Sequence, residues 1–193
     1  MLEIFPQTYA RFARLLPQQP SNMLDVGCGT GLELDEIFRR FPDVRVTGID
    51  ITESMLSILK RKHSDKHLDL IVGDFREVPF GVDAFDTVIS FEALHHLCQK
   101  DKARLYGKIY AALKSGGYYI ECDYVAECEE EVELYLEDRE KRRTAQKLPE
   151  DALLHYDTPF TKQLQEKLLC DAGFRRVVLA HEERATAVFV ARK

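Results

Sequence analysis

The sequence contains no tryptophan, only three methionines, and no pair of cysteines in a C-x-x-C pattern. Its five cysteines are odd in number and widely spread, which excludes the dense disulfide framework of small secreted domains and favours the reducing cytoplasm. No apolar run approaches the roughly 20 residues that cross a bilayer, and the first residues lack the basic start of a signal peptide. We therefore expect a cytoplasmic protein that does not act at a membrane.

Excess charge of one sign is also small. The 193 residues include 27 basic and 33 acidic side chains, and the net charge of −6 argues against nucleic acid as the main partner. With 45% hydrophobic residues, a chain of this length can bury roughly 70% of its surface around one core. We expect a single domain over residues 1–193, and the sequence carries no signal for an oligomeric state.

Short apolar segments alternate with helical patterns along most of the chain, beginning with a helix expected at about 7–16. This alternation indicates an α/β fold: a doubly wound, mostly parallel sheet of about seven strands with helices on both faces. The last two predicted strands, within 175–192, are separated by only about three residues. So short a connection cannot join parallel strands, and the last strand is therefore expected to run antiparallel near one edge of the sheet.

A charged segment interrupts the alternation at about 125–160. Before it, a helix is expected through 102–114, ended by a Ser-Gly-Gly sequence, and a strand at 118–124. The first half of the segment is acidic and its second half is basic, which predicts a helix followed by a loop. Two interpretations remain open: a solvated helix whose charges match its dipole, or a cap over a ligand cleft.

Three glycines, Gly27, Gly29 and Gly31, follow the first apolar strand directly. A phosphate-binding P-loop would require a lysine that is absent, and a dinucleotide-binding loop would require glycine where Leu32 stands. In open α/β sheets, ligands bind outside the carboxyl ends of the strands. The loop therefore indicates a ligand that approaches the backbone closely without placing a pyrophosphate on the helix N-terminus.

Acidic residues follow the next two strands. Asp50 comes about 20 residues after the glycine loop, where a carboxylate can accept hydrogen bonds from both ribose hydroxyls of a nucleoside. Asp74 ends the third strand and is placed to accept from an adenine amino group, with Ile51 or Phe75 packing against the ring. Either acid alone is also a common turn residue. Together with the glycine loop, at three adjacent strand ends, they predict a nucleoside site.

The segments LDVGCGTG, GIDI, GDFREVPF, FDTVISFEALHHL and AGFRRVVL, in this order, resemble the motifs of class I S-adenosylmethionine-dependent methyltransferases. The resemblance implies a Rossmann-like sheet of order 3-2-1-4-5-7-6, S-adenosylmethionine as cofactor, and direct in-line methyl transfer. An [ND]-P-P-[YF] pattern of nucleic-acid enzymes is absent, which favours a small-molecule acceptor. The cofactor contacts that the resemblance implies are Gly27, Cys28, Gly29, Gly31, Asp50, Ile51, Asp74, Phe75 and Phe91.

Candidates on the acceptor side are fewer. His95 and His96 are adjacent, so on a helix they point about 100° apart and only one of them can face the cleft, where it would act as a base. Packing or capping of the short helix explains them equally well. His155, Tyr156 and Tyr9 are further candidate substrate contacts, although loop formation and core packing are common uses of such residues.

Metal chemistry is not indicated by the spacing of these residues. His95 and Cys98 are three residues apart, but no second pair of ligands accompanies them, so we expect no metal. Two other functions remain open: a non-catalytic module that binds S-adenosylmethionine or S-adenosylhomocysteine, and, disfavoured by Leu32, an NAD-linked oxidoreductase. The sequence does not identify the methyl acceptor.

Overall fold

The computed structural model of the chain describes residues 6–16, 19–149 and 156–193. The strands are β1 (Asn22–Val26), β2 (Arg45–Asp50), β3 (Leu68–Val72), β4 (Phe85–Phe91), β5 (Leu113–Ala126), β6 (Phe160–Thr161), β7 (Arg176–Glu183) and β8 (Thr186–Arg192). The helices are α1 (Pro6–Leu15), α2 (Leu32–Arg40), α3 (Glu53–Lys62), α4 (Gln99–Ala112), α5 (Glu129–Ala145) and α6 (Lys162–Asp171), with a 3₁₀ helix, η1, at Leu94–His96. In these described ranges, no helix is both long and apolar enough to cross a bilayer.

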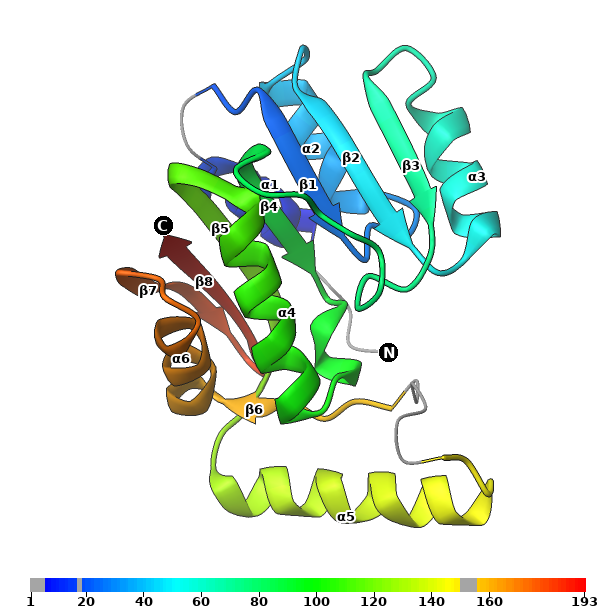
Figure 1. Ribbon diagram of the computed structural model, residues 1–193, viewed down its shortest axis with the longest axis vertical. Coiled ribbons are helices and arrows are strands. Elements are labelled where there is room, and N and C mark those ends of the chain that lie inside the picture. The colour runs from blue at the N-terminus through cyan, green and yellow to red at the C-terminus, as the bar shows by residue number, and fades with distance from the viewer. Residues whose placement is uncertain (1–5, 17–18, 150–155) are drawn as a thin grey trace.

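The sheet has the order β3-β2-β1-β4-β5-β8-β7, and β6 pairs separately with β5 (Figure 1). Apart from the two-residue β6, this is the predicted 3-2-1-4-5-7-6 order. The last strand, β8, runs antiparallel to both β5 and β7, while β1 to β5 pair in parallel. The short turn between Glu183 and Thr186 enforces this reversal, as the sequence predicted.

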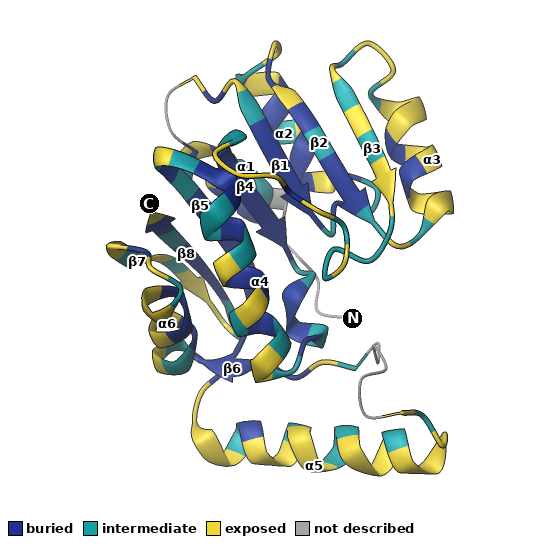
Figure 2. Cartoon of the chain, viewed as in Figure 1, coloured by how far each residue is buried: buried dark blue, intermediate teal, exposed yellow. Residues whose placement is uncertain are grey.

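Helices cover both faces of the sheet. Residues of α4 and α6 pack in one buried cluster, and residues of α1, α2 and α3 pack in another on the opposite face. Neighbouring residues of β5 divide between them: Tyr119 belongs to the first cluster and Ile120 to the second, as the alternation of a strand requires. Figure 2 shows the central strands as the most deeply buried part of the chain.

The boundary between α4 and β5 differs from the prediction. The helix ends at Ala112 and the strand begins at Leu113, so the Ser-Gly-Gly sequence lies inside β5 rather than at a helix end. The cause is pairing: Leu113 already aligns with Phe85 of β4, and the register then shifts along the two strands. Gly116, with φ of 79°, allows this irregularity within the strand.

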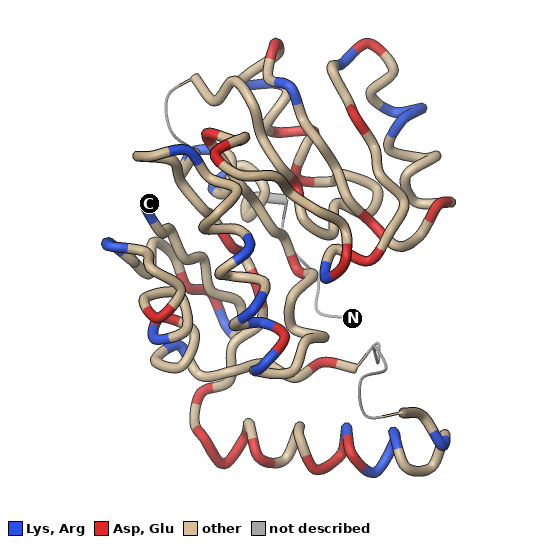
Figure 3. Tube along the Cα trace, viewed as in Figure 1, with Lys and Arg blue, Asp and Glu red and all other residues tan. Residues whose placement is uncertain are grey.

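The charged segment contains α5, which runs from Glu129 to Ala145, while residues 125–126 still belong to β5. Figure 3 shows acidic residues mainly along its first half and basic residues toward its end, the arrangement that the helix dipole favours. Val132 is its buried residue, and Leu134 and Leu136 are exposed. Residues 156–159 lead from this segment back to β6 beside the sheet.

Candidate functional site

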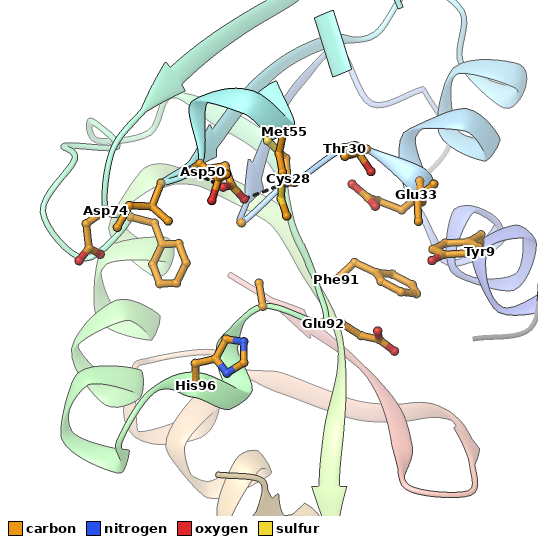
Figure 4. A pocket seen from close by; sticks show the side chains of 18 residues that line it. Tyr9, Cys28, Thr30, Glu33, Asp50, Met55, Asp74, Phe91, Glu92 and His96 are labelled. Atoms are coloured by element: carbon orange, nitrogen blue, oxygen red, sulfur yellow. Dashed lines mark hydrogen bonds between the residues drawn. The ribbon is translucent and has the colours of Figure 1, made fainter. Parts of the chain in front are cut away.

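A cavity of about 370 Å³ opens at the carboxyl ends of β1, β2 and β4 (Figure 4). Its volume lies in the range of small-molecule sites. The nine residues that the sequence suggested for cofactor contacts all line it, together with Tyr9 and His96: Gly27, Cys28, Gly29, Gly31, Asp50, Ile51, Asp74, Phe75 and Phe91. His95 and Tyr156 are not among its lining residues, and His155 lies outside the described residues.

Two positions of the glycine loop have a backbone conformation and surroundings that suit only glycine. Gly27 has φ of 77°, and an added Cβ would collide with Ala93, which follows β4. Gly31, at the start of α2, has φ of 63°, and an added Cβ would lie 2.5 Å from Leu59 Cδ1. The amide of Gly27 donates to the carbonyl of Ile49 at 2.8 Å. Left-handed backbone and close packing therefore fix the loop against β2 and the cavity.

Asp50 connects this loop to the cavity. Its carboxylate accepts hydrogen bonds from the amide of Gly29 at 2.9 Å and from the amide of Thr52 at 2.8 Å. Figure 4 shows Asp50 between Asp74 and Cys28, with a dashed line marking a hydrogen bond toward the glycine loop. A carboxylate has about four acceptor positions, so Asp50 keeps capacity to accept from a ligand while the backbone holds it in place.

A pair of buried acids lies beside the loop. Asp25 is fully buried in β1, and Glu33, in the first turn of α2, is only 5% exposed and lines the cavity. Burial, followed by their mutual charge, raises the pKa of Asp25 well above its usual value, and burial also raises the pKa of Glu33. Each carboxyl group is the hydrogen-bond partner of the other, and within the described residues no other group donates to the Asp25 oxygens or to Glu33 Oε1. Such carboxyl groups are suited to a cationic ligand group.

Asp74 is held by its own neighbour. Arg76 donates to its carboxylate from Nη2 at 2.6 Å and from Nε at 2.9 Å. Partial burial raises the pKa of Asp74, but Arg76 outweighs this and lowers the pKa below its usual value. The carboxylate is thus oriented by Arg76, and its contact with an adenine amino group stays a prediction.

Aromatic rings line the opposite part of the cavity, which we call the acceptor end and define by Tyr9, Phe91, Glu92 and His96. Tyr9 of α1 stacks on Phe91 at the end of β4, with ring centroids 4.8 Å apart. Burial, then the charge of Glu92, raises the pKa of Tyr9 to about 12, so its hydroxyl stays protonated. The acceptor end thus combines apolar ring surface with the polar groups of Tyr9, Glu92 and His96.

Glu92 follows Phe91 directly and has a strained backbone, with φ of 49°. Burial, then the charge of Asp123, raises its pKa to about 7. Tyr124 donates to its Oε2 at 3.4 Å, while Oε1 is buried without a partner among the described residues. A carboxyl group with this pKa in a cavity is suited to exchange a proton near neutral pH.

The two histidines of η1 differ in surroundings. His96 lines the cavity, whereas His95 is 5% exposed and its Nδ1 lies 2.6 Å from Oδ1 of Asp123 on β5. Burial lowers the pKa of His95, but the charge of Asp123 outweighs this and raises it. Tyr156 packs against α5, with its ring 4.8 Å from the guanidinium carbon of Arg142.

Sequence reasoning missed two acidic residues of the cavity, Glu33 and Glu92. Glu92 directly follows β4, and Asp50 is the last residue of β2. Ligands bind at the carboxyl ends of parallel strands, and this reasoning, which identified Asp50, applies to Glu92 as well. The sequence gives less indication for Glu33, because an acidic residue in the first turn of a helix is usually exposed to solvent and interacts with the helix dipole. Only the packing of α2 against β1 shows that it is buried.

Comparison with known proteins identifies the segment that carries these features. Residues 23–117 match a family model described as a methyltransferase domain. Over 111 residues the chain is 29% identical to a phthiotriol/phenolphthiotriol dimycocerosates methyltransferase of Mycobacterium tuberculosis. This match covers 58% of the present chain and 40% of the mycobacterial protein. Over 121 residues it is 36% identical to the 18S rRNA (guanine(1575)-N(7))-methyltransferase of Saccharomyces cerevisiae. This match covers 57% of the present chain and 43% of the yeast protein. The chain therefore spans less than half the length of these two relatives.

The fold extends the similarity beyond the matched segment. Human N-acetylserotonin methyltransferase, solved in complex with S-adenosylmethionine, superposes with a TM-score of 0.69 at 22% identity over 95% of this chain and 51% of that one. This likeness concerns the fold alone. Residues 23–117, which contain the glycine loop, Asp50 and Asp74, thus match the methyltransferase domain family, and the fold is that of the class I S-adenosylmethionine-dependent methyltransferases.

Proposed function

We propose that this chain transfers the methyl group of S-adenosylmethionine to a small-molecule acceptor bound at the acceptor end of the cavity. The main observation is that a single cavity is lined both by the glycine loop with Asp50 and by Tyr9, Phe91 and Glu92. When bound, the cofactor supplies a sulfonium-activated methyl group, and the protein supplies position and electrostatics.

The cavity residues fit this cofactor. Asp25 and Glu33 place a buried pair of carboxyl groups beside the glycine loop, which matches the positive charge of the cofactor's methionine part. Asp50 is fixed by two backbone amides and can accept from the ribose hydroxyls. Ile51 and Phe75 offer apolar surface for the adenine ring.

Glu92 is the proposed general base for the acceptor. Its pKa of about 7 lets it accept a proton from a hydroxyl, amine or thiol as the methyl group is transferred, and Tyr124 holds one of its oxygens in place. Tyr9 and Phe91 bound the space in which the acceptor lies, so that the reacting atom is held close to the methyl group.

The character of the cavity favours a small acceptor over RNA. Glu33, Asp50 and Glu92 all line it, and such an acidic surface repels a phosphate backbone. The chain as a whole carries a net charge of −6. All five cysteines are free, which supports the proposed cytoplasmic location.

The test is the release of S-adenosylhomocysteine when the protein is incubated with S-adenosylmethionine and a panel of neutral and cationic metabolites. We expect turnover with a member of this panel and none with structured RNA. Turnover with RNA alone would contradict the proposed acceptor class. Tight cofactor binding without turnover of any acceptor would instead support a non-catalytic binding module.

A further inference from the structure

Three potential metal ligands meet beside the acceptor end, from two segments far apart in the sequence. Asp157, which precedes β6, has its Oδ1 at 3.4 Å from Nε2 of His95 and at 3.5 Å from Nδ1 of His96. The three ligand atoms all lie within 4.8 Å of one another. We propose that His95, His96 and Asp157 bind a divalent transition-metal ion.

The distances of Asp157 from the two imidazoles are compatible with a shared cation. A charge-assisted N–H···O bond is about 2.7–2.9 Å long, clearly shorter than either contact to Asp157. Two ligands at about 2.0–2.1 Å from a tetrahedral ion lie about 3.3–3.4 Å from each other, which matches the spacing of the Asp157 oxygen from each imidazole nitrogen.

The orientation of His95 is already set for a metal. Its Nδ1 lies 2.6 Å from Asp123 Oδ1 and is occupied by this contact, so Nε2 is the nitrogen that remains facing Asp157. Asp123 is itself fixed, because it also accepts from the amide of Leu94 at 3.1 Å. A carboxylate behind the non-coordinating nitrogen is the usual support of a metal-binding histidine.

The segment that carries Asp157 is also fastened to η1. The next residue, Thr158, is buried, and its amide donates to the carbonyl of His95 at 2.7 Å. Its hydroxyl lies 2.9 Å from the same carbonyl and 3.2 Å from that of Leu97. Asp157 is therefore placed by the backbone beside both histidines, although its own side chain is about half exposed.

Two imidazoles and one carboxylate are ligands typical of Zn²⁺, Fe²⁺ and Co²⁺ sites that keep open positions for water or substrate. The sequence did not reveal this set, because the third ligand is Asp157 rather than the nearby Cys98. His96 also lines the cavity, which places the proposed ion beside the acceptor end. There the ion would bind an oxygen or nitrogen atom of the acceptor, a step that rests on the proposed methyl transfer.

The experiment measures metal binding by the full chain without cofactor or acceptor. Co²⁺ is followed by its visible absorption bands and Zn²⁺ by calorimetry, with Asp157→Ala and His96→Ala as site variants. The matched control is His67→Ala, which removes an exposed histidine that precedes β3. We expect one ion per chain, affinity at least 10-fold weaker in each site variant, and no change in the control.

Absence of binding at micromolar protein, or equal affinity in the site variants and the parent chain, would overturn the proposal. Circular dichroism of each variant verifies that it is folded. Asp157→Ala is the site variant that disturbs packing least, because the Asp157 side chain is about half exposed. Because no cofactor is present, metal binding stands or fails independently of methyl transfer: a chain that binds Co²⁺ but not S-adenosylmethionine would contradict only the proposed function.

Discussion

At the scale of single residues, Asp50 both fixes the glycine loop and faces the ligand cavity. We expect Asp50→Ala to weaken S-adenosylmethionine binding by about 1.5–3 kcal/mol, because charge-assisted hydrogen bonds to the ligand are lost. Calorimetric titration measures this change, and Asp69→Ala, an exposed position on the neighbouring β3, is the control. Equal affinity in Asp50→Ala and the parent chain would show that Asp50 does not contact the ribose.

Glu92 gives the second prediction, on pH. Its pKa of about 7 means that the basic, ionised form increases as the pH rises through 7. The groups around it are Asp123, Tyr124, Asp157 and His95, and the acids among them raise its pKa while His95 lowers it. We expect kcat/KM to rise with pH up to about 7 and then level off, and Glu92→Gln to lose about 10²–10⁴-fold in rate.

Cofactor affinity in Glu92→Gln provides the control for this prediction, because Asp50 and the glycine loop are unchanged. The substitution also removes a buried charge, so its melting temperature at pH 8 is expected to exceed that of the parent chain. A variant that keeps the parent rate and pH profile would assign the proton transfer to another group or to water.

Single residues of the site were predictable from the sequence where their position at the end of a parallel strand decides their role. Gly27 and Asp50 follow parallel strands, and the carboxyl ends of such strands meet at one edge of the sheet. Asp157 was not predictable, because the backbone bonds of Thr158 to η1 bring it to the histidines across a long segment. The burial of the Asp25–Glu33 pair likewise depends on packing, which the spacing of residues in the sequence does not reveal.

At the scale of elements, the junction of β1 and α2 gives a matched pair of substitutions. An added Cβ at Gly27 collides with Ala93, whereas at Gly29 its nearest neighbour is Met55 Sδ at 3.8 Å, an ordinary contact. Both positions have positive φ, so each alanine costs about 1–2 kcal/mol of backbone strain. We expect Gly27→Ala to lose about 1–3 kcal/mol more than Gly29→Ala, measured by urea unfolding. Equal losses would contradict the close approach of the β1 and β4 loops.

Most elements were predictable because their apolar periodicity and their connections agree. The reversal of β8 follows from a short turn, and the order of the sheet from the family resemblance. The start of β5 at Leu113 was not predictable, because pairing with Phe85 overrides the helix-ending signal of the glycines. The two-residue β6 has no periodicity at all and exists only through its pairing with β5.

At the scale of the whole molecule, buried acids link stability to pH. Asp25, Glu33 and Glu92 have folded-state pKa values above their usual ones, so the folded chain holds protons that the unfolded chain releases. Their contribution is complete below the unfolded-state pKa values of about 4 and is lost as the pH rises above them, in the case of Glu92 through about 7. His63, whose pKa burial lowers, opposes this trend in part.

We therefore expect the melting temperature without ligand to fall between pH 5 and pH 8. A cationic ligand group beside Asp25 and Glu33 favours their ionised forms, so S-adenosylhomocysteine is expected to raise the melting temperature more at pH 8 than at pH 5.5. Differential scanning fluorimetry over this range, with and without the ligand, measures both trends. A ligand-induced increase that is larger at pH 5.5 would contradict the assignment of the acid pair.

The pairing of β6 with β5 has a consequence for exchanging parts of this molecule. Val125 aligns with Phe160 and Ala126 with Thr161, so the segment that contains α5 leaves and re-enters the sheet at neighbouring points. Closing a loop of a different length between fixed ends changes the entropy only slowly with its length. Exchange of the α5 part of this segment for that of a relative, with Asp157 and Thr158 retained, is therefore expected to leave the sheet register and the glycine loop as they are.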